Sequence, residues 1–376
     1  MNPVYLDCNA TTPIDPEVRE LVLHFLDEEF GNAGSRTHSF GARAKQAVEG
    51  ARDQVANVVS AKRDEVIFTS GATESNNLAI LGLKQFAETS GKKHLITTAI
   101  EHKAVLEPFE QLEAEGFEVT RLPVDRSGRL SPADLETELR DETALVSVMQ
   151  VNNETGVHQP LGEITNVLEG HSAFFHTDAA QGFGKDIDAL RNRRIDLISI
   201  SGHKIYAPKG VGALVMRRRG YKHPPLEPLM VGGGQERGLR PGTLPVGLLV
   251  AIGKAAEISV RDNEFRRTQC QRIREKAMKA LAPLEPKYSG DLEYATEHVL
   301  NLSFGIDSEA LIVALKDLVA ISNGSACTSS SYTPSHVLTA MGMTEEQANC
   351  CVRISWCHMT PEVDWEQIRK RITQLA

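Results

Sequence analysis

The amino-acid sequence predicts an α/β protein with a large domain, built on a mostly parallel sheet flanked by helices, and a smaller α+β domain. Short apolar runs alternate with amphipathic stretches of helical period along most of the chain. Polar and reactive residues cluster directly after the apolar runs, where open α/β sheets bind their ligands. Past about residue 250 this alternation gives way to a long helical stretch. We therefore expect residues 16–250 to form the large domain, and residues 1–15 with 251–376 to form the small one.

The expected elements of the large domain follow in chain order. Residues 65–71 (EVIFTSG) have the apolar character of a buried strand, and residues 72–88 carry the apolar stripe of a helix. Residues 93–102 (KHLITTAIEH) favour a second strand, and a helix follows over residues 104–116. Further strands are predicted at 143–153, 174–181, 195–204 and 210–218.

A helical pattern over residues 246–282 leads from the large domain into the small one. Beyond it, residues 298–304 (HVLNLSF) predict a strand and residues 308–317 (SEALIVALKD) predict a helix. The mixture of short elements is typical of an α+β domain.

Composition and charge argue against a membrane-spanning, secreted or nucleic-acid-binding protein. The 376-residue chain has 41% hydrophobic and 24% charged residues, as globular proteins do. Its longest apolar run, residues 244–253, is too short to span a bilayer, and its first residues lack the features of a signal peptide. We therefore expect a cytoplasmic protein whose six cysteines are reduced. The net charge of −9 argues against nucleic-acid or membrane binding, and we interpret the basic runs 191–194 and 216–222 as solvated element ends.

Lys204 directly follows an apolar run in SISGHKIYAPKGVG (199–212) and stands among small residues. Desolvation or a nearby cation lowers the pKa of such an amine and makes it a nucleophile toward carbonyl groups. The alternative is a lysine that extends from a strand end into solvent. This stretch alone does not decide between the two interpretations.

The segment HTDAAQG (176–182) supplies two further groups that a pyridoxal phosphate cofactor needs. Asp178 offers a carboxylate for the pyridinium nitrogen, which keeps the ring protonated and electron-withdrawing. Gln181 offers an amide that can reach the ring hydroxyl. These residue types, together with a strand-end lysine, favour this cofactor.

An anion cradle for the phosphate is predicted at SGATESNN (70–77), a glycine turn followed by a helix start that contains Thr73. Free backbone N–H groups and the helix dipole favour a phosphate there. Ser201 and His203 lie close to the same place in the expected sheet. Because adjacent strand residues point to opposite faces, His203 can face the phosphate while Lys204 faces the aldehyde.

Over nearly its full length the sequence resembles cysteine desulfurases of the NifS/IscS group in the aminotransferase class V family. The segments that match, in order, are YLDCNATTP, FGNAGSRTH, FTSGATESNNLAI, EHKAVLEP, VNNETGV, TDAAQ, SGHKIYAPKGVGAL, GGGQERGLRPGTLP and GSACTSSS. The resemblance implies pyridoxal phosphate fold type I and an enzyme that removes sulfur from L-cysteine. It also implies that the cofactor is bound by Lys204, Asp178, Gln181, Thr73, Ala72, Ser201 and His203.

The resemblance implies roles for five further residues. His102 would stack on the ring and act as an acid or base, and Asn153 would contact the cofactor or the substrate carboxylate. Arg353 would bind the substrate carboxylate, for which its bidentate fork is suited, and Asn32 would be a weak substrate contact. Thr243 would reach the phosphate held by the other subunit of a homodimer. The alternatives are a hydrogen-bonded loop histidine, an ion pair in the small domain and, for Asn32, turn chemistry.

Cys327 is the only cysteine of NGSACTSSS (323–331), which has neither the apolar neighbours of a structural cysteine nor the second cysteine of a zinc site. The resemblance implies that its thiolate takes the substrate sulfur as a persulfide and leaves L-alanine. His102 or the released Lys204 would move the α-proton. Glycine and serine lower the cost of bending this loop between pocket and acceptor. We assign no resident metal, and Cys327 is a candidate transient ligand of a cluster.

The protein that accepts the sulfur is less well defined by the sequence. Three segments look most like the desulfurase of DNA phosphorothioation systems: FGNAGSRTHSFG, LKDLVAISNGSACTSSSYTPSHVL and GGGQERGLRPGTLP. The chain also ends where the small domain is expected to end, without the extension that housekeeping desulfurases use to dock a scaffold protein. Both points imply an iron–sulfur partner of a DNA-modification system. The alternatives are a housekeeping desulfurase for iron–sulfur clusters or tRNA thiolation, and a selenocysteine lyase.

Overall fold

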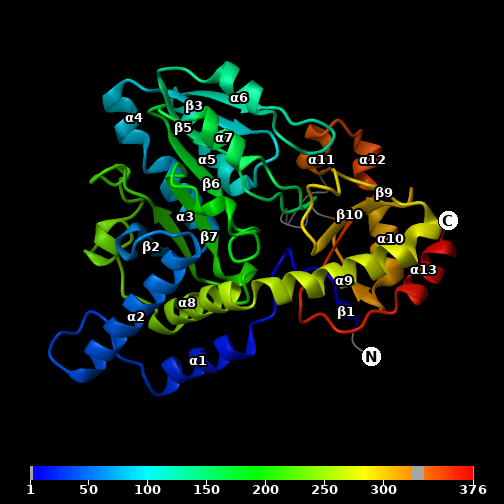
Figure 1. Cartoon of the computed structure of the whole chain (residues 1–376), viewed down its shortest axis with the longest axis horizontal. Helices are drawn as coiled ribbons and strands as arrows, with labels where there is room; N and C mark the ends of the chain where they lie inside the picture. Colours follow the sequence, from blue (N-terminus) through cyan, green and yellow to red (C-terminus); the bar gives the residue numbers. More distant parts are fainter. Residues whose placement is uncertain (1–2, 324–333, 376) are drawn as a thin grey trace.

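The computed structural model describes residues 3–323 and 334–375, so the predicted sulfur acceptor Cys327 lies outside the described residues. Figure 1 shows a larger and a smaller part side by side along the long axis of the molecule. Helices α8 (Val246–Arg261) and α9 (Asn263–Leu281) run end to end from the larger part to the smaller one.

The larger part contains a seven-stranded sheet in the order β2-β8-β7-β6-β5-β3-β4. All neighbours pair in parallel except β8, which is antiparallel to both β7 and β2. The α/β class and the expected strands are confirmed, and β4 is an additional edge strand. The strands are β2 Val66–Thr69, β3 His94–Thr98, β4 Glu118–Leu122, β5 Thr143–Ser147, β6 Phe174–Asp178, β7 Leu197–Ser201 and β8 Gly212–Met216.

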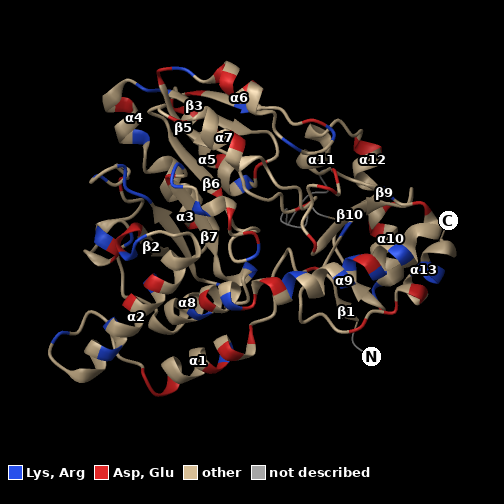
Figure 2. Ribbon diagram, in the orientation of Figure 1, with Lys and Arg blue, Asp and Glu red and all other residues tan. Residues whose placement is uncertain are grey.

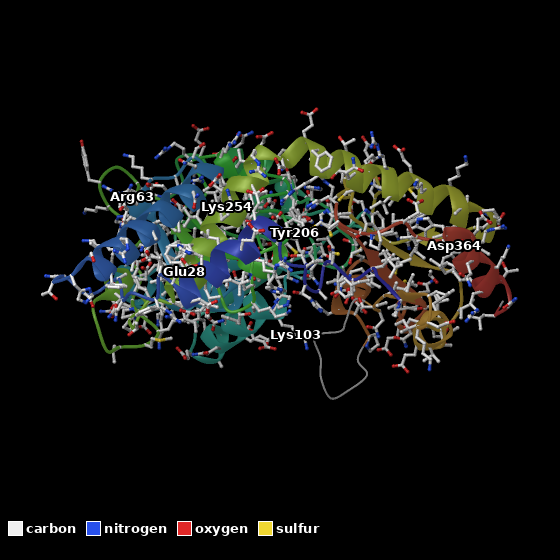
Figure 3. All side chains as sticks on the ribbon, turned by 90° about the horizontal axis from the view of Figure 1, so that it is seen from below. Glu28, Arg63, Lys103, Tyr206, Lys254 and Asp364 are labelled. Atoms are coloured by element: carbon white, nitrogen blue, oxygen red, sulfur yellow. The ribbon has the colours of Figure 1, made fainter. Side chains whose placement is uncertain are left out.

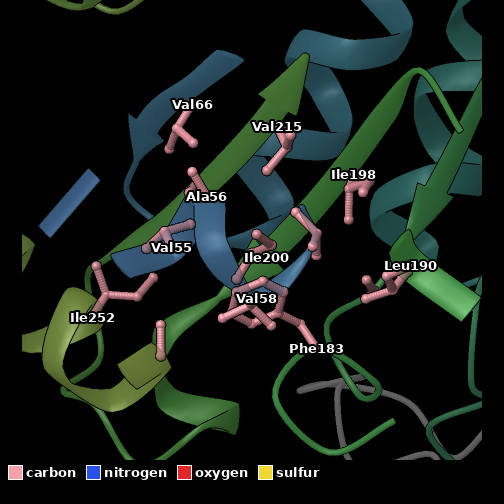
Figure 4. Packing of buried hydrophobic residues seen from close by; sticks show 14 of the residues in the cluster. Val55, Ala56, Val58, Val66, Phe183, Leu190, Ile198, Ile200, Val215 and Ile252 are labelled. Atoms are coloured by element: carbon pink, nitrogen blue, oxygen red, sulfur yellow. The ribbon is translucent and has the colours of Figure 1, made fainter. Parts of the chain in front are cut away.

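Side chains along each central strand alternate between two buried clusters, as the pleat requires. In β8, Ala213 and Val215 belong to one cluster, and Leu214 and Met216 belong to the other. Figure 4 shows the first cluster, where α2 and α8 pack on the strands; α3, α4 and α5 contribute to the second. The remaining helices of this part are α1 Pro16–Asp27, α2 Ser39–Val58, α3 Ala72–Leu81, α4 Lys84–Ser90, α5 Lys103–Ala114, α6 Pro132–Glu138 and α7 Leu161–Val167.

The smaller part has two sheets of its own. β10 pairs antiparallel with β12 and β9, and β1 pairs in parallel with β11. Because β1 is N-terminal, the start of the chain packs in the core of this part, where Leu6 is fully buried. The elements are β1 Val4–Tyr5, β9 Lys287–Tyr288, β10 Val299–Ser303, β11 Val319–Ala320, β12 Cys351–Ser355, α10 Ser308–Leu315, α11 His336–Ala340, α12 Glu345–Asn349 and α13 Trp365–Thr373.

The single helical pattern over residues 246–282 is two helices, because Asp262 leaves the helical conformation (φ −109°, ψ 13°). The buried apolar residues of α8, through Ile258, pack in the first cluster of the larger part. Helix α9 instead contributes Cys270 and Leu281 to the cluster of the smaller part. We therefore propose that the large domain extends to Arg261 instead of ending at residue 250.

Acidic and basic residues are interspersed along both parts of the molecule (Figure 2). The expectation that the basic run 216–222 is solvated is wrong for Arg217, which is almost fully buried and donates to backbone carbonyl groups, among them those of Leu190 and Ile195. Arg194 and Arg219 both bind the carboxylate of Asp196. Among the described residues, no helix has the length and apolar composition of a bilayer span.

Candidate active site

A cavity of about 430 Å³ lies at the carboxyl ends of β6 and β7, beside the first turn of α3. The predicted site residues that line it are Ala72, Thr73, His102, Asn153, Asp178, Gln181, Ser201, His203, Lys204 and Arg353. Its other wall residues are Asn9, Ala10, Ser70, Gly71, Glu74, Asn76, Ala104, Met149, Val151, Ala180, Lys209 and Gly210. Residues from both parts of the molecule therefore enclose one pocket.

Lys204 ends a single turn of 3-10 helix, Gly202–Lys204, that follows β7. Its amine donates to the backbone carbonyl oxygen of Ala10 at 2.8 Å and also to that of Asn9. The side chain is part-buried and faces the cavity, so it is not a lysine extended into solvent. The two carbonyl groups hold the amine at the wall of the pocket, where a carbonyl substrate or cofactor can meet it.

Two residues after Lys204, Tyr206 joins the parts of the molecule. Figure 3 labels it between Arg63 in the larger part and Asp364 in the smaller one. Its ring contacts His358 edge-on at 4.8 Å, and the Arg266 guanidinium lies over it at 4.7 Å. Tyr206 also has a positive φ of 72°, which is uncommon for a large side chain. These contacts fix the backbone that carries the lysine.

Asp178 is the last residue of β6 and only 6% exposed. One carboxylate oxygen accepts from the Asn76 side-chain amide at 2.7 Å, and the other accepts from the backbone N–H of Ala180 at 2.9 Å. Asn76 lies on α3 and is fully buried. The carboxylate is thus fixed at the base of the cavity, as a partner for a ring nitrogen must be.

Gln181 follows in the same turn and is also buried. Its Nε2 donates to the carbonyl oxygen of Asn9 at 3.0 Å, and its Oε1 has no hydrogen-bond partner among the described residues. Buried polar atoms are usually paired, so an orphaned acceptor beside a cavity favours a ligand with a hydroxyl group. This observation agrees with the ring-hydroxyl contact expected of Gln181.

The expected anion cradle is present at the start of α3. Gly71 precedes the helix with φ +157° and no side-chain cap, so the first-turn N–H groups at Ala72 and Thr73 remain for a ligand. A Cβ on Gly212 in β8 would lie only 2.5 Å from the Cα of Gly71, so this strand approaches the turn closely only because residue 212 is glycine. Ser201 adds a hydroxyl at the wall of the cavity.

His203 lies on the same wall, and its Nδ1 is 3.1 Å from the hydroxyl of Thr11. Burial, followed by the charges of Lys204 and Lys209, lowers the pKa of His203 to about 4. The imidazole is therefore neutral at pH 7. It can donate a hydrogen bond to a phosphate but contributes no charge to it.

His102 is the N-cap of α5, and its Nδ1 accepts from the backbone N–H of Ala104 at 3.0 Å. An Nδ1 that accepts a hydrogen bond carries no proton, so the neutral ring carries its proton on Nε2. In this form the ring has no unprotonated nitrogen other than the Nδ1 bonded to Ala104. The geometry therefore favours Lys204 over His102 as the base that moves the α-proton.

Glu101 lies immediately before His102 and is fully buried. Its Oε1 accepts from the backbone N–H of Met149 at 2.8 Å and from the hydroxyl of Thr98 at 2.7 Å. Burial raises the pKa of Glu101 to about 8, and the charge of Asp178 adds to this effect. Glu101 is therefore mostly a neutral acid at pH 7.

We expect Glu101→Gln to flatten the pH dependence of folding stability between about pH 5 and pH 8. The pKa of Glu101 is higher in the folded protein than in the unfolded chain, so the folded protein binds more protons and loses stability as the pH rises. The neutral amide removes this loss, a difference of roughly 3 kcal/mol over that range. Urea unfolding at several pH values measures it, and a variant with the wild-type slope would contradict the prediction.

Arg353 lies on β12 and lines the cavity, with its side chain 4% exposed. Its Nη1 donates to the carbonyl oxygen of Asn153 at 3.0 Å, and its Nη2 pairs with Asp7 Oδ1 at 2.7 Å. The guanidinium therefore both faces the pocket and forms an ion pair. The two interpretations of Arg353 from the sequence are not exclusive.

Two predicted residues are not brought into the cavity. Asn32 is exposed, and its Oδ1 accepts from the backbone N–H of Gly34 at 2.8 Å, which is turn chemistry. Thr243 is also exposed and is not a wall residue. Within one subunit the described site includes neither of them.

Three residues of the site were missed by the sequence reasoning. Asn9 binds both Gln181 and Lys204 through its carbonyl oxygen, Asn76 orients Asp178, and Asp7 pairs with Arg353. Asn76 had a signal, because a polar residue on the buried face of a helix needs a partner. Asp7 and Asn9 had no such signal in the sequence, because their contacts are with residues far away along the chain.

The residues present fit pyridoxal phosphate. The cavity combines a lysine amine, a fixed carboxylate, an orphaned acceptor at Gln181 and an uncapped helix start with nearby Ser201. Each matches one group of that cofactor: aldehyde, ring nitrogen, ring hydroxyl and phosphate. In the part of the chain that the structure describes, no cluster of three or more His, Cys, Asp and Glu residues could hold a metal ion.

The chain is similar to known proteins over most of its length. A family model described as aminotransferase class V matches residues 4–368. The cysteine desulfurase IscS of Klebsiella pneumoniae is 47% identical over 364 residues, which covers 96% of this chain and 89% of the relative. The crystal structure of DndA from Streptomyces lividans has a TM-score of 0.83 and 51% identity, covering 94% of this chain and 99% of that one. A structure of SspA in complex with cysteine has a TM-score of 0.80 and 39% identity over 96% of this chain and 99% of that one.

Proposed function

Because the chain belongs to the aminotransferase class V family and is a cysteine desulfurase, we propose that it converts L-cysteine to L-alanine with pyridoxal phosphate and passes the sulfur to an acceptor protein as a persulfide on Cys327. One observation carries the proposal: Lys204 and the fixed carboxylate of Asp178 line the same cavity as the uncapped start of α3.

The cofactor would be held by one covalent bond and by several polar contacts. Lys204 would bind the aldehyde, Asp178 would pair with the ring nitrogen and Gln181 would meet the ring hydroxyl, since all three line the cavity. The phosphate would be bound by Ala72, Thr73, Ser201 and His203, and Thr243 would be contributed by the second subunit of a homodimer. When bound, the cofactor supplies an electron sink that weakens bonds at the α- and β-carbons of the substrate.

The residues of this chain then act on the substrate directly. Arg353 and the Asn153 side chain bind the carboxylate of L-cysteine and orient its α-carbon. The amine of Lys204 takes and returns the α-proton, since Nδ1 of His102 is already bonded to Ala104. His102, which lines the same cavity, would stack on the cofactor ring.

Sulfur transfer balances without an outside oxidant. The thiolate of Cys327 attacks the sulfur of the substrate, so a sulfur–sulfur bond forms as the carbon–sulfur bond breaks. The electron pair of the broken bond stays on the substrate β-carbon, which takes a proton and becomes the methyl group of L-alanine. The persulfide on Cys327 then passes its outer sulfur to a thiolate of the acceptor. The same cysteine could bind a cluster only transiently.

We propose a DNA phosphorothioation system as the destination, with an iron–sulfur partner protein as acceptor. The 51% identity to DndA over 94% of the chain supports this pathway. The 47% identity to IscS supports the alternative, a housekeeping desulfurase for clusters or tRNA thiolation. A cytoplasmic homodimer is proposed with either pathway. Exposed apolar side chains around α1, including Leu26 at 62% and Phe30 at 70%, support a subunit interface.

The proposal is tested with the purified holoprotein and L-[³⁵S]cysteine. We expect L-alanine and protein-bound sulfane sulfur in equal amounts, and label that moves to an iron–sulfur protein of a DNA-modification system faster than to a cluster scaffold or a tRNA-thiolation acceptor. If the cluster scaffold or the tRNA-thiolation acceptor is labelled faster, the sulfur goes to that protein and the DNA phosphorothioation pathway is wrong. Absence of both alanine and sulfur would reject the desulfurase mechanism. Adding selenocysteine as a competing substrate tests the selenocysteine lyase alternative, because a lyase would prefer it to L-cysteine.

A further inference from the structure

The guanidinium that faces the pocket is already paired inside the protein. Asp7 Oδ1 lies 2.7 Å from Nη2 of Arg353, and it is the only carboxylate within ion-pair distance of that arginine among the described residues. The side chains of Asp7 and Arg353 are 17% and 4% exposed. A pair this deeply buried is poorly screened by solvent, so each charge strongly affects what its partner binds.

Asp7 is held in place from several directions. The hydroxyl of Ser322 donates to the same Oδ1 at 3.2 Å. The backbone of Asp7 forms a bridge with Ser355, and its carbonyl oxygen accepts from the hydroxyl of Tyr5 at 2.9 Å. Arg353 and Ser322 are also joined by backbone hydrogen bonds in both directions. Moving the carboxylate away from the arginine would therefore break several hydrogen bonds.

A second acidic group, Glu154, lies near Arg353. Glu154 is buried and accepts from the hydroxyl of Ser335 at 2.5 Å. Burial raises the pKa of Glu154, while Ser335 and the charges of His336, Arg353 and His102 oppose that shift. Arg353 therefore meets a substrate carboxylate in surroundings that already hold one direct anionic partner and a second acidic group nearby.

We propose that Asp7 sets the affinity of the pocket for amino-acid carboxylates, by partly neutralising Arg353 and so weakening its hold on substrate and product. The proposal rests on the proposed role of Arg353 in binding the substrate carboxylate. Its consequence is that the product L-alanine, which has the same carboxylate as L-cysteine, leaves more readily. Asp7 is thus a positioning residue that acts through Arg353 and touches no reacting atom.

Equilibrium binding of two matched ligands tests the inference without turnover. L-alanine and L-alaninamide both have a primary amine and a methyl side chain, and they differ in having a carboxylate or a neutral amide. Each is titrated into the holoprotein, and the change in the cofactor absorbance gives its Kd. The ratio of the two Kd values isolates the carboxylate contribution from effects on the rest of the pocket.

We expect Asp7→Asn to tighten L-alanine binding by roughly 3- to 30-fold, with the Kd of L-alaninamide nearly unchanged. Asp7→Glu keeps the charge and is expected to keep the wild-type ratio. Asp307→Asn is the matched control, because it removes a carboxylate that caps α10 and does not line the cavity. Thermal unfolding checks that each variant is folded, and Asp7→Ser is a second neutral variant should the asparagine protein be unstable.

An unchanged ratio in both neutral variants would overturn the inference, and so would an equal change in Asp307→Asn. The proposed function fails in a different way: if Arg353→Gln leaves the ratio at its wild-type value, Arg353 does not bind the carboxylate at all. Stronger inhibition of turnover by added L-alanine in Asp7→Asn would support the inference independently.

Discussion

Replacing Lys204 by alanine is expected to remove the cofactor absorbance band at about 400 nm and to lower desulfurase turnover roughly 10⁴-fold. The effect is large because one amine has two tasks, binding the aldehyde and carrying the α-proton. The cavity has another amine in its wall, that of Lys209, but it is not the one held by the carbonyl groups of Asn9 and Ala10. Absorbance spectra and L-alanine formation measure the two tasks separately.

The control for this variant is Lys222→Ala, which removes an exposed lysine that is not part of the cavity wall. It is expected to keep both the absorbance band and the turnover. A Lys204→Ala protein that still shows the band and desulfurates L-cysteine at the wild-type rate would refute the assignment of the cofactor lysine.

Replacing Cys327 by serine is expected to lower sulfur transfer roughly 10³-fold while leaving the cofactor absorbance intact. A serine hydroxyl is a far weaker nucleophile than a thiolate at neutral pH, so it cannot take the substrate sulfur. The variant should still bind L-cysteine, because the groups that meet the amine and carboxylate are unchanged. Mass spectrometry of the intact protein detects the persulfide as one added sulfur atom.

Cys350→Ser is the matched control, since Cys350 is a free and partly exposed cysteine outside the cavity wall. It is expected to accept sulfur on Cys327 at the wild-type rate. If Cys327→Ser releases sulfide from L-cysteine as fast as the wild type does, the persulfide route is wrong. The proposed binding of the cofactor by Lys204 would not be affected by that result.

The strand-end part of the site could be predicted from sequence because it follows from local pattern. An apolar run locates each strand, and parallel strands end at one edge of the sheet, so Asp178, Ser201 and Lys204 had to lie near one another. The glycine turn before α3 also has a local signature, since a helix start without a capping side chain is readable from its residues. Resemblance to a family then supplied roles that pattern alone left open.

The remaining part depends on tertiary contacts that no local pattern contains. Asp7 pairs with Arg353 across 346 positions of sequence, and Asn9 donates to the carbonyl oxygen of Asn153 across 144. The break at Asp262 was missed for a similar reason, because α8 and α9 share one helical period but pack in different cores. Thr243 does not line the cavity within one subunit, so its expected contact with the phosphate of the other subunit can be tested only in a dimer.

The pairing of β1 with β11 has a consequence for how the protein is synthesised. The carbonyl groups that hold the amine of Lys204 belong to Asn9 and Ala10, and the backbone N–H of Asn9 is itself bonded to Ser355. The segment around Asn9 can therefore complete the pocket only after Ser355, 346 positions later, has been synthesised. We therefore expect a nascent chain to bind vitamin B6, and to acquire its colour, only once residue 355 has been synthesised and folded back onto Asn9.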